Sequence, residues 1–151
     1  MTIEGKNDGA APRRIRLGMV GGGQGAFIGG VHRMAARLDD RYELVAGALS
    51  SDAARAKASA AELHIAPDRA YAGYAEMARA EAARNAAGKD GIDVVAIVTP
   101  NHLHAPIATA FLDAGIDVIC DKPVTTTLAE AMTLVERVRK TKRLFALTHN
   151  S

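Results

Sequence analysis

Short apolar runs alternate with longer amphipathic or alanine-rich stretches along the chain. The runs are rich in Val, Ile and Leu and nearly continuous in apolarity, which is typical of strands that are covered on both faces. They occupy residues 14–20, 42–49, 93–98, 117–120 and 144–149. The pattern therefore predicts five buried strands.

The stretches between these runs carry helical signals. Apolar residues recur at helical spacing in three of them, at Ile28, Val31, Ala35 and Leu38, at Ile107, Ala110, Phe111 and Ala114, and at Ala131, Leu134, Val135 and Val138. Thr127 and Glu130 have the form of a capping box, and residues 51–63 and 74–86 are alanine-rich helix formers. Strands that alternate with helices are joined by right-handed crossovers, so we predict an α/β fold of the Rossmann type. Such a fold is a doubly wound parallel sheet with helices on both faces.

Composition narrows the class of protein. A chain of 151 residues can bury a real core, and 48% hydrophobic with 24% charged residues is typical of a soluble globular domain. The net charge is only +2 without a dense Lys/Arg block, so we expect no nucleic-acid or membrane-surface partner. No apolar run approaches the ~20 residues of a membrane helix. The single cysteine, Cys120, and the absence of a signal-peptide core favour a cytoplasmic protein.

Glycine is concentrated directly after the first apolar run. Residues 21–26, Gly-Gly-Gly-Gln-Gly-Ala, fit the dinucleotide-binding pattern G-x-G-x-x-G/A. In that pattern Gly21 makes the tight turn, Gly23 lets the backbone approach a pyrophosphate, and Ala26 lets helix and strand pack closely. The alternative is a flexible strand-to-helix turn without a ligand. The position after the first strand favours a phosphate site, and its predicted residues are Gly21, Gly23, Gln24, Gly25, Ala26, Phe27 and Ile28.

The end of the second predicted strand bears on the choice between NAD and NADP. NAD-binding folds place an acid there for the ribose hydroxyls, about 20 residues beyond the glycines. Ser50 and Ser51 stand at that position, and Arg55 or Lys57 can approach a 2′-phosphate from the next helix. Asp52 competes for the acidic role, although its place suits a helix N-cap. NADP is therefore favoured over NAD, with Ser50, Ser51 and Arg55 as cofactor-binding residues.

Residues 1–13 are polar and aperiodic, so we expect a mobile leader there and a dinucleotide-binding domain over residues 14–151. Two segments of this domain stand out, Thr99-Pro100-Asn101-His102-Leu103-His104-Ala105-Pro106 and Asp121-Lys122-Pro123. They resemble the T/S-P-N-x-x-H-x-P and E-K-P segments of the family of glucose–fructose oxidoreductase, inositol dehydrogenase and rhizopine-type enzymes (Gfo/Idh/MocA). With the glycine loop, the resemblance covers the chain from about residue 14 to its end.

Members of this family are NAD(P)-dependent oxidoreductases that act mostly on sugars, polyols and their derivatives. The resemblance implies that Lys122 is catalytic, hydrogen-bonding the substrate hydroxyl and assisting proton transfer. It also implies that the cofactor crevice is lined by Thr99, Pro100, Asn101, His104, Asp121, Lys122 and Asn150. Asp121 replaces the usual Glu, which shortens by one methylene the carboxylate that helps to place Lys122.

The family has a second domain that shapes the substrate site, supplies a D-x-x-x-H segment and commonly mediates oligomers. That segment has no counterpart in this sequence. We therefore expect the NAD(P)-binding half of an oxidoreductase acting on CH-OH groups, inactive alone as a fragment. The expected partners are a small sugar or polyol and, in a homo-oligomer, further copies of the protein.

Several alternatives stay open from the residues alone. The chain can be a stand-alone nucleotide-binding or redox-sensing module, or an α/β interaction domain with a degenerate glycine loop. Lys122 can be a surface lysine held in a turn by Pro123, and Asn101 can serve a helix entry. His102 and His104 have no further ligand at metal spacing, so we expect no metal site.

Overall fold

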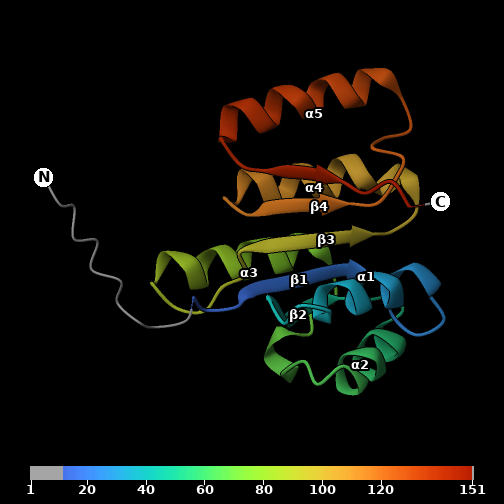
Figure 1. Ribbon diagram of the computed structural model, residues 1–151, viewed down its shortest axis with the longest axis vertical. Coiled ribbons are helices and arrows are strands. Elements are labelled where there is room, and N and C mark those ends of the chain that lie inside the picture. The colour runs from blue at the N-terminus through green and yellow to red at the C-terminus, as the bar shows by residue number, and fades with distance from the viewer. Residues whose placement is uncertain (1–11, 151) are drawn as a thin grey trace, which may run out of the picture.

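The computed structural model describes residues 12–150, so residues 1–11 of the predicted leader and residue 151 lie outside the described residues. The strands are β1 (Ile15–Gly21), β2 (Tyr42–Ala48), β3 (Val94–Val98), β4 (Asp117–Cys120) and β5 (Phe145–Leu147). The α-helices are α1 (Phe27–Arg37), α2 (Ala53–Glu62), α3 (Tyr74–Ala86), α4 (His104–Asp113) and α5 (Leu128–Thr141), and short 3-10 turns cover Pro67–Arg69 and Asn101–Leu103. Every predicted strand and helix is present, with bounds that differ by a few residues (Figure 1).

The strands form one parallel sheet in the order β2-β1-β3-β4-β5. A single bridge extends the sheet beyond β2, where Ala70 pairs with Gly47 and the Tyr71 N–H donates to the Gly47 carbonyl oxygen at 2.8 Å. If this bridge is counted as a minimal third strand, the spatial order becomes 3-2-1-4-5-6, that of dinucleotide-binding sheets. The sequence did not predict this element, because the surrounding segment lacks an apolar run.

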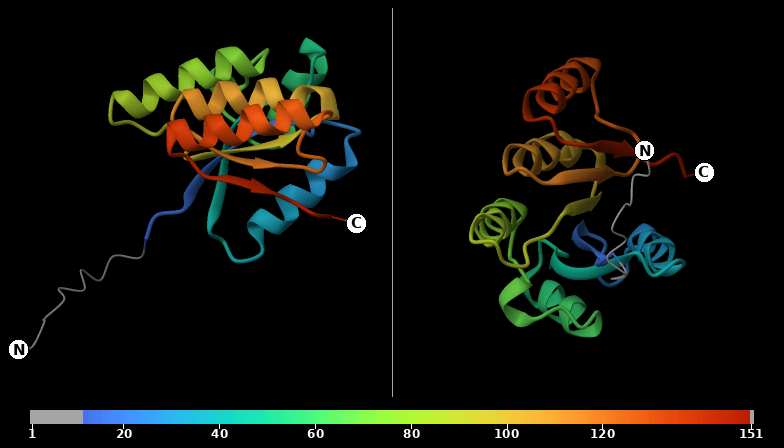
Figure 2. Two further views of the ribbon diagram at one scale, coloured as in Figure 1. Left: turned by 90° about the horizontal axis from the view of Figure 1, so that it is seen from above. Right: turned by 60° about the vertical axis from the view of Figure 1, so that its left-hand side comes forward.

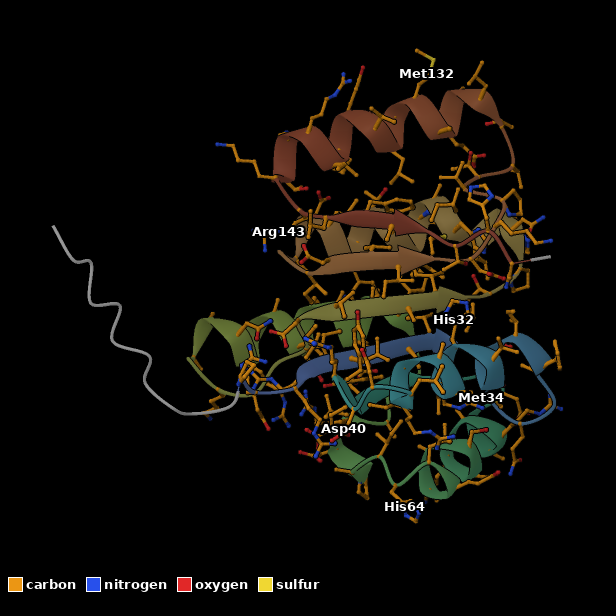
Figure 3. All side chains as sticks on the ribbon, viewed as in Figure 1. His32, Met34, Asp40, His64, Met132 and Arg143 are labelled. Atoms are coloured by element: carbon orange, nitrogen blue, oxygen red, sulfur yellow. The ribbon has the colours of Figure 1, made fainter. Side chains whose placement is uncertain are left out.

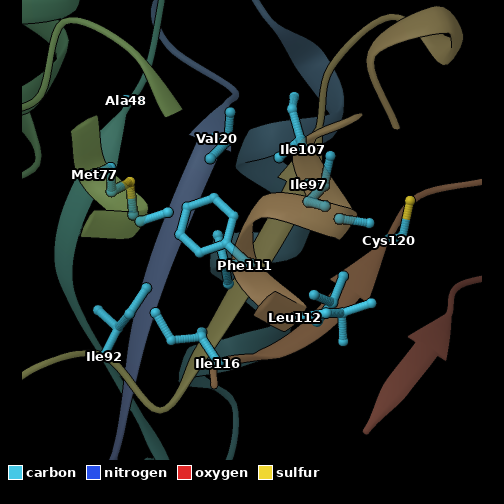
Figure 4. Close-up of a cluster of buried hydrophobic side chains, with 14 of the residues drawn as sticks. Val20, Ala48, Met77, Ile92, Ile97, Ile107, Phe111, Leu112, Ile116 and Cys120 are labelled. Carbon is cyan, nitrogen blue, oxygen red and sulfur yellow. The ribbon is translucent and has the colours of Figure 1, made fainter. Parts of the chain in front are cut away.

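Helices cover both faces of the sheet, which confirms the doubly wound prediction (Figure 2). The larger core lies under α3, α4 and α5, with Phe111 of α4 fully buried at its centre (Figure 4). The smaller core lies between the other face of the sheet and helices α1 and α2, around Leu17 and Met19 of β1. The protein therefore has two separate hydrophobic cores, one on each face of the sheet. No helix among residues 12–150 is long and apolar enough to cross a membrane.

Of the apolar stripe predicted for α1, only Ile28 faces the sheet. Leu38 is 82% exposed and Val31 is 38% exposed, whereas Ile28 and Ala36 pack against the smaller core. The buried residue of the helix is Gly29. Apolar spacing misplaced the face because small and polar residues occupy the positions nearest the sheet.

A buried ion pair joins the loop after α2 to α3. The Arg69 guanidinium donates to both carboxylate oxygens of Glu81, at 3.0 and 2.6 Å, and the two side chains are 7% and 0% exposed. The same carboxylate accepts from the Tyr71 hydroxyl at 2.9 Å and from the Ile92 N–H at 3.1 Å. The Glu81 carboxylate therefore has four donors from two segments, residues 69–71 and Ile92, which are separate from α3 in sequence. The Glu81 hydrogen bond and burial raise the pKa of Tyr71 to about 12, with burial the larger cause.

Candidate functional site

The C-terminal ends of the parallel strands meet at one edge of the sheet, and most of the predicted site residues follow directly from them. β1 leads into residues 21–26, here called the glycine loop, β3 leads into Thr99, and β4 leads into Asp121 and Lys122. β1 and β3 are neighbours, but α1 lies on one face of the sheet and α4 on the other. Open α/β sheets bind ligands in the crevice at such a reversal.

The glycines at the end of β1 and in α1 let β1, β3 and α1 approach one another more closely than any side chain at these positions would permit. Gly21 has a φ of +79°, and a Cβ there would lie 2.8 Å from the Val98 carbonyl oxygen. A Cβ on Gly29 would lie 2.5 Å from the Cα of Gly22. Real Cβ atoms do not approach backbone so closely, so both positions need glycine. The result is a turn that leaves the end of β1 clear of side chains.

Three predicted details of the glycine pattern differ in the structure. Helix and strand pack closely at Gly29 and not at Ala26, which is exposed at the N-cap of α1, because the helix begins only at Phe27. Gly23 packs inside the protein: its N–H donates to the Leu49 carbonyl oxygen at 3.1 Å, and a Cβ would lie 2.7 Å from that oxygen. A bulky residue at Gly23 would therefore clash with the backbone of Leu49, directly after β2, whether or not a phosphate binds.

The third difference concerns Gln24, which was predicted to bind phosphate. Its N–H donates to Ser59 Oγ and its side-chain amide donates to Glu62, both at 2.9 Å. Both contacts tie the loop to α2. Among the residues predicted to bind phosphate, the exposed ones without a contact to α2 are therefore Gly25, Ala26 and Phe27.

The start of α1 has the features of an anion-binding helix end. No side chain caps it, and its first turn holds no acidic residue. The N–H groups of a first turn have no partner inside the helix, and the helix dipole adds positive potential there. Phe27 is 84% exposed and Ile28 is half-buried, so neither side chain closes the end off completely. A phosphate group suits this end of the helix.

Arg33 of α1 supports the glycine loop from behind, and sequence reasoning missed it. Its guanidinium donates to the Gly22 carbonyl oxygen at 2.6 Å and contacts Met19 Sδ at 3.4 Å. Burial lowers the pKa of Arg33 from its usual value, and the charge of Arg37 lowers it further. No sequence signal marked Arg33, because its target lies on the turn before the helix.

The end of β2 holds the residues predicted to select the adenosine ribose. Ser50 is half-buried and its Oγ accepts from the Asp52 N–H at 3.1 Å, while Ser51 and Arg55 are exposed. Asp52 accepts from the Arg55 N–H at 2.7 Å and is the N-cap of α2, which confirms its predicted capping role. Asp52, the acidic residue nearest to the end of β2, is thus engaged as the N-cap of α2.

His104 joins the two motif segments. It is 1% exposed, its Nδ1 lies 2.7 Å from the Pro123 carbonyl oxygen, and its Nε2 lies 3.0 Å from the Thr99 carbonyl oxygen. Both ring nitrogens have a backbone carbonyl oxygen within hydrogen-bonding distance, so His104 links the two walls of the crevice. The role of His104 as a cofactor-binding residue stays a prediction.

The remaining predicted residues after β3 are open to solvent. Thr99 is half-buried, and Pro100 and Asn101 are exposed. Asn101 begins the 3-10 turn ahead of α4, whose N-cap is Leu103 without a side-chain hydrogen bond. Asn101 thus lies in the turn that leads into α4, which agrees with the helix-entry alternative, although it is not the N-cap of α4.

Lys122 stands exposed between an anchored Asp121 and Pro123, to which it is joined by a cis peptide bond. The N–H of Asp121 donates to the Ile97 carbonyl oxygen at 3.0 Å. One carboxylate oxygen of Asp121 accepts from Thr148 Oγ1 at 2.9 Å and from Asn150 Nδ2 at 3.0 Å. Asp121, although one methylene shorter than the usual Glu, is thus fixed by its side chain and its backbone, and this fixes the position of the adjoining Lys122 backbone.

Cys120, at the end of β4, has no evident chemistry. Cys120 is fully buried, and burial, with the charge of Asp121, raises the pKa of its thiol to about 12. That value leaves the reactive thiolate unpopulated at neutral pH. Within residues 12–150 no group of three or more His, Cys, Asp or Glu side chains is arranged to hold a metal ion.

Comparison with known proteins supplies the family context. The sequence model described as "Oxidoreductase family, NAD-binding Rossmann fold" (GFO_IDH_MocA) matches residues 15–149. An uncharacterized oxidoreductase of Bacillus subtilis is 38% identical over 136 residues, covering 89% of this chain and 34% of the relative.

Solved structures agree in fold. An oxidoreductase from Sinorhizobium meliloti is 56% identical with a TM-score of 0.84, covering 91% of this chain and 37% of that one. An inositol dehydrogenase homologue from Azotobacter vinelandii, in complex with NAD+, is 40% identical with a TM-score of 0.85, covering 90% of this chain and 34% of that one. A further structure of an inositol dehydrogenase homologue from that organism holds NADH and myo-inositol. The chain spans about a third of the length of these proteins.

Proposed function

Because the chain belongs to the Gfo/Idh/MocA family of oxidoreductases, we propose that it is the dinucleotide-binding domain of an enzyme acting on a sugar, polyol or derivative. The observation that carries this proposal is the side-chain-free turn at the end of β1, where Gly21, Gly22 and Gly29 crowd against an uncapped helix start. The NAD+ and myo-inositol complexes of the Azotobacter homologues support the choice of ligands.

In this proposal each part of the sheet edge binds one part of the cofactor. Gly25, Ala26 and the first turn of α1 hold the pyrophosphate, and the end of β2 holds the adenosine ribose. Thr99, Asn101 and Lys122 lie toward the nicotinamide side. The nicotinamide ring, when bound, supplies the acceptor or donor of hydride.

Lys122 is proposed to handle the proton of the substrate hydroxyl. Oxidation of an alcohol releases a proton as well as a hydride, so one protein group must accept it. Lys122 is exposed at the same edge as the predicted nicotinamide side, and its backbone is held through Asp121. The amine of a lysine can exchange a proton, which a guanidinium cannot do.

We further propose that catalysis needs residues outside this chain. The relatives are about three times longer, since the chain covers 34% to 37% of them. Lys122 is exposed at the edge of the sheet. The chain alone is therefore expected to bind a dinucleotide without turning over substrate.

The phosphate site is tested by replacing Ala26 with aspartate. A carboxylate at this N-cap should stabilise the folded protein by ~1 kcal/mol, because it caps α1 and complements the helix dipole. It should also weaken dinucleotide binding by about tenfold or more, because like charges near a protein surface repel by roughly 1–4 kcal/mol at contact. Urea unfolding and calorimetric titration with NAD(H) and NADP(H) measure the two effects.

The matched control is Ala26→Asn, which caps the helix without adding charge. It should gain similar stability and lose less affinity than Ala26→Asp. If both variants bind dinucleotide as tightly as the wild type, phosphate does not lie at this helix end and the proposal is wrong.

We propose a preference for NADP over NAD at the end of β2. Ser50 brings no negative charge there, Asp52 is engaged as a cap, and Arg55 is exposed in the first turn of α2. A charge-assisted contact to a 2′-phosphate contributes about 1.5–3 kcal/mol, so Arg55→Ala should weaken NADP(H) binding by about tenfold or more and leave NAD(H) binding unchanged. Calorimetric titration of both cofactors decides the matter, and equal wild-type affinities would contradict the preference.

A further inference from the structure

Helix α1 contacts the glycine loop and Asp121 through two adjacent residues, Arg33 and His32. Arg33 donates to the Gly22 carbonyl oxygen at 2.6 Å, as described above. His32 Nε2 lies 3.5 Å from Asp121 Oδ1, and the two side chains are 11% and 14% exposed. His32 points toward the sheet edge, whereas Met34, two residues further on, is 63% exposed (Figure 3). One helix thus touches the glycine loop and the residue before Lys122.

The side chains around the Asp121 carboxylate come from two parts of the fold, the segment after β5 and helix α1. Thr148 and Asn150, which donate to the same oxygen at 2.9 and 3.0 Å, both follow β5 and belong to the edge of the sheet. Among the described residues, His32 is the partner of that carboxylate that comes from α1. Asp121 is therefore held by the sheet and contacted by the helix.

The distances give these contacts different roles. The bonds of 2.9 and 3.0 Å are ordinary hydrogen bonds, whereas the 3.5 Å between His32 and Asp121 is longer than the usual hydrogen bond. A hydrogen bond between His32 and Asp121 would form if α1 moved toward the sheet edge by a few tenths of an ångström, with the other two bonds left in place. Helices shift as packed units, so a change at the first turn of α1 reaches His32 directly.

We propose that His32 is a positioning residue that couples occupancy of the phosphate site to the placement of Lys122. A phosphate at the start of α1 draws the helix end toward it, His32 closes on Asp121, and the carboxylate turns the adjoining Lys122 backbone. This inference rests on the proposed function, because it requires a phosphate group at α1.

The test uses the 151-residue chain and ADP-ribose, which carries the pyrophosphate but no nicotinamide ring. Because the second ribose of ADP-ribose is on the side of Lys122, the variants below separate a response transmitted by His32 from a direct effect of the ligand. In the wild type, ADP-ribose should shift the backbone amide resonances of Asp121 and Lys122 in ¹H–¹⁵N spectra. His32→Leu should lose the shift at Lys122. His32→Gln should restore it, because the Gln amide nitrogen reaches the place of the imidazole Nε2.

Met34→Leu is the matched control, since it changes a 63% exposed position of the same helix and leaves His32, Asp121 and the other partners of Asp121 in place. It should keep the response at Lys122. The inference is overturned if ADP-ribose binds and the Lys122 shift is the same in His32→Leu as in the wild type. It is equally overturned if Met34→Leu abolishes the shift as His32→Leu does, because the loss would then be unspecific.

Binding itself is measured separately by calorimetry. Absence of ADP-ribose binding to the wild type would remove the proposed function and this inference with it, whereas binding with an unchanged Lys122 response removes the inference alone. Should His32→Leu fail to fold, His32→Asn takes its place. Its amide falls short of Asp121 by one methylene, so it should lose the response that His32→Gln keeps.

Discussion

Replacing Lys122 with methionine, in a full-length enzyme that carries this domain, is expected to lower turnover by about 10²–10⁴-fold, the usual contribution of general acid–base assistance. Dinucleotide affinity should stay near the wild-type value, because the proposed phosphate contacts come from the glycine loop and α1. Methionine keeps the length of the side chain and removes the exchangeable proton. Steady-state kinetics with the preferred polyol, together with cofactor titration, separate the two effects.

Lys122→Arg distinguishes proton transfer from simple charge. Arginine keeps the positive charge but does not give up its proton at neutral pH, so its turnover should fall nearly as far as that of Lys122→Met. Lys140→Met, at an exposed position of α5, should leave turnover unchanged. Wild-type turnover in Lys122→Met would contradict the catalytic role and favour the alternative that Lys122 is a surface lysine held in a turn by Pro123.

The 151-residue chain alone is expected to lack the activity that Lys122 supports in the full-length enzyme. Positioning of reactants can account for ~7–11 kcal/mol of a barrier, and one correctly placed lysine does not replace it. We therefore expect no turnover of inositol, glucose or a related polyol above the level of a Lys122→Met control of the same length. Clear turnover by the isolated wild-type chain would show that the described domain is sufficient.

Replacing Arg69 with methionine is expected to lower the free energy of unfolding by about 3–5 kcal/mol, because it leaves the Glu81 charge buried without its cation. Glu81 is fully buried, and in the variant its carboxylate would keep only the neutral donors Tyr71 and Ile92. The loop after α2, the start of β3 and α3 all meet at this carboxylate. Urea unfolding followed by circular dichroism measures the loss.

Arg84→Met is the matched control. Arg84 pairs with Asp90 at 2.7 Å and with Asp68 at 2.9 Å, but these carboxylates are 57% and 72% exposed. Exposed pairs contribute about 0–1 kcal/mol, so this variant should lose far less stability than Arg69→Met. Replacing both Arg69 and Glu81 by apolar residues should recover much of the loss, since no unpaired charge then remains. Equal losses in Arg69→Met and Arg84→Met would contradict the assignment of Glu81 as a buried charge that depends on Arg69.

The amino-acid sequence determined the elements of this protein and the positions of its loops. Apolar runs and helical spacing identified each strand and helix, because burial on two faces or on one stripe leaves a local pattern. The capping box of Thr127 and Glu130 and the N-cap at Asp52 are present as predicted, since both depend on residues within one turn. The family motifs placed the glycine loop and Lys122 at strand ends for the same local reason.

The tertiary structure decided how these loops support one another. His104 lies between the Thr99 and Pro123 carbonyl oxygens, and His32 reaches Asp121 from another helix, although no local pattern marks either contact. The sheet-facing side of α1 also depends on the neighbour it packs against, and so its apolar stripe was misleading. Contacts between residues far apart in the chain arise from strand order and helix packing, which the sequence specifies only through the whole fold.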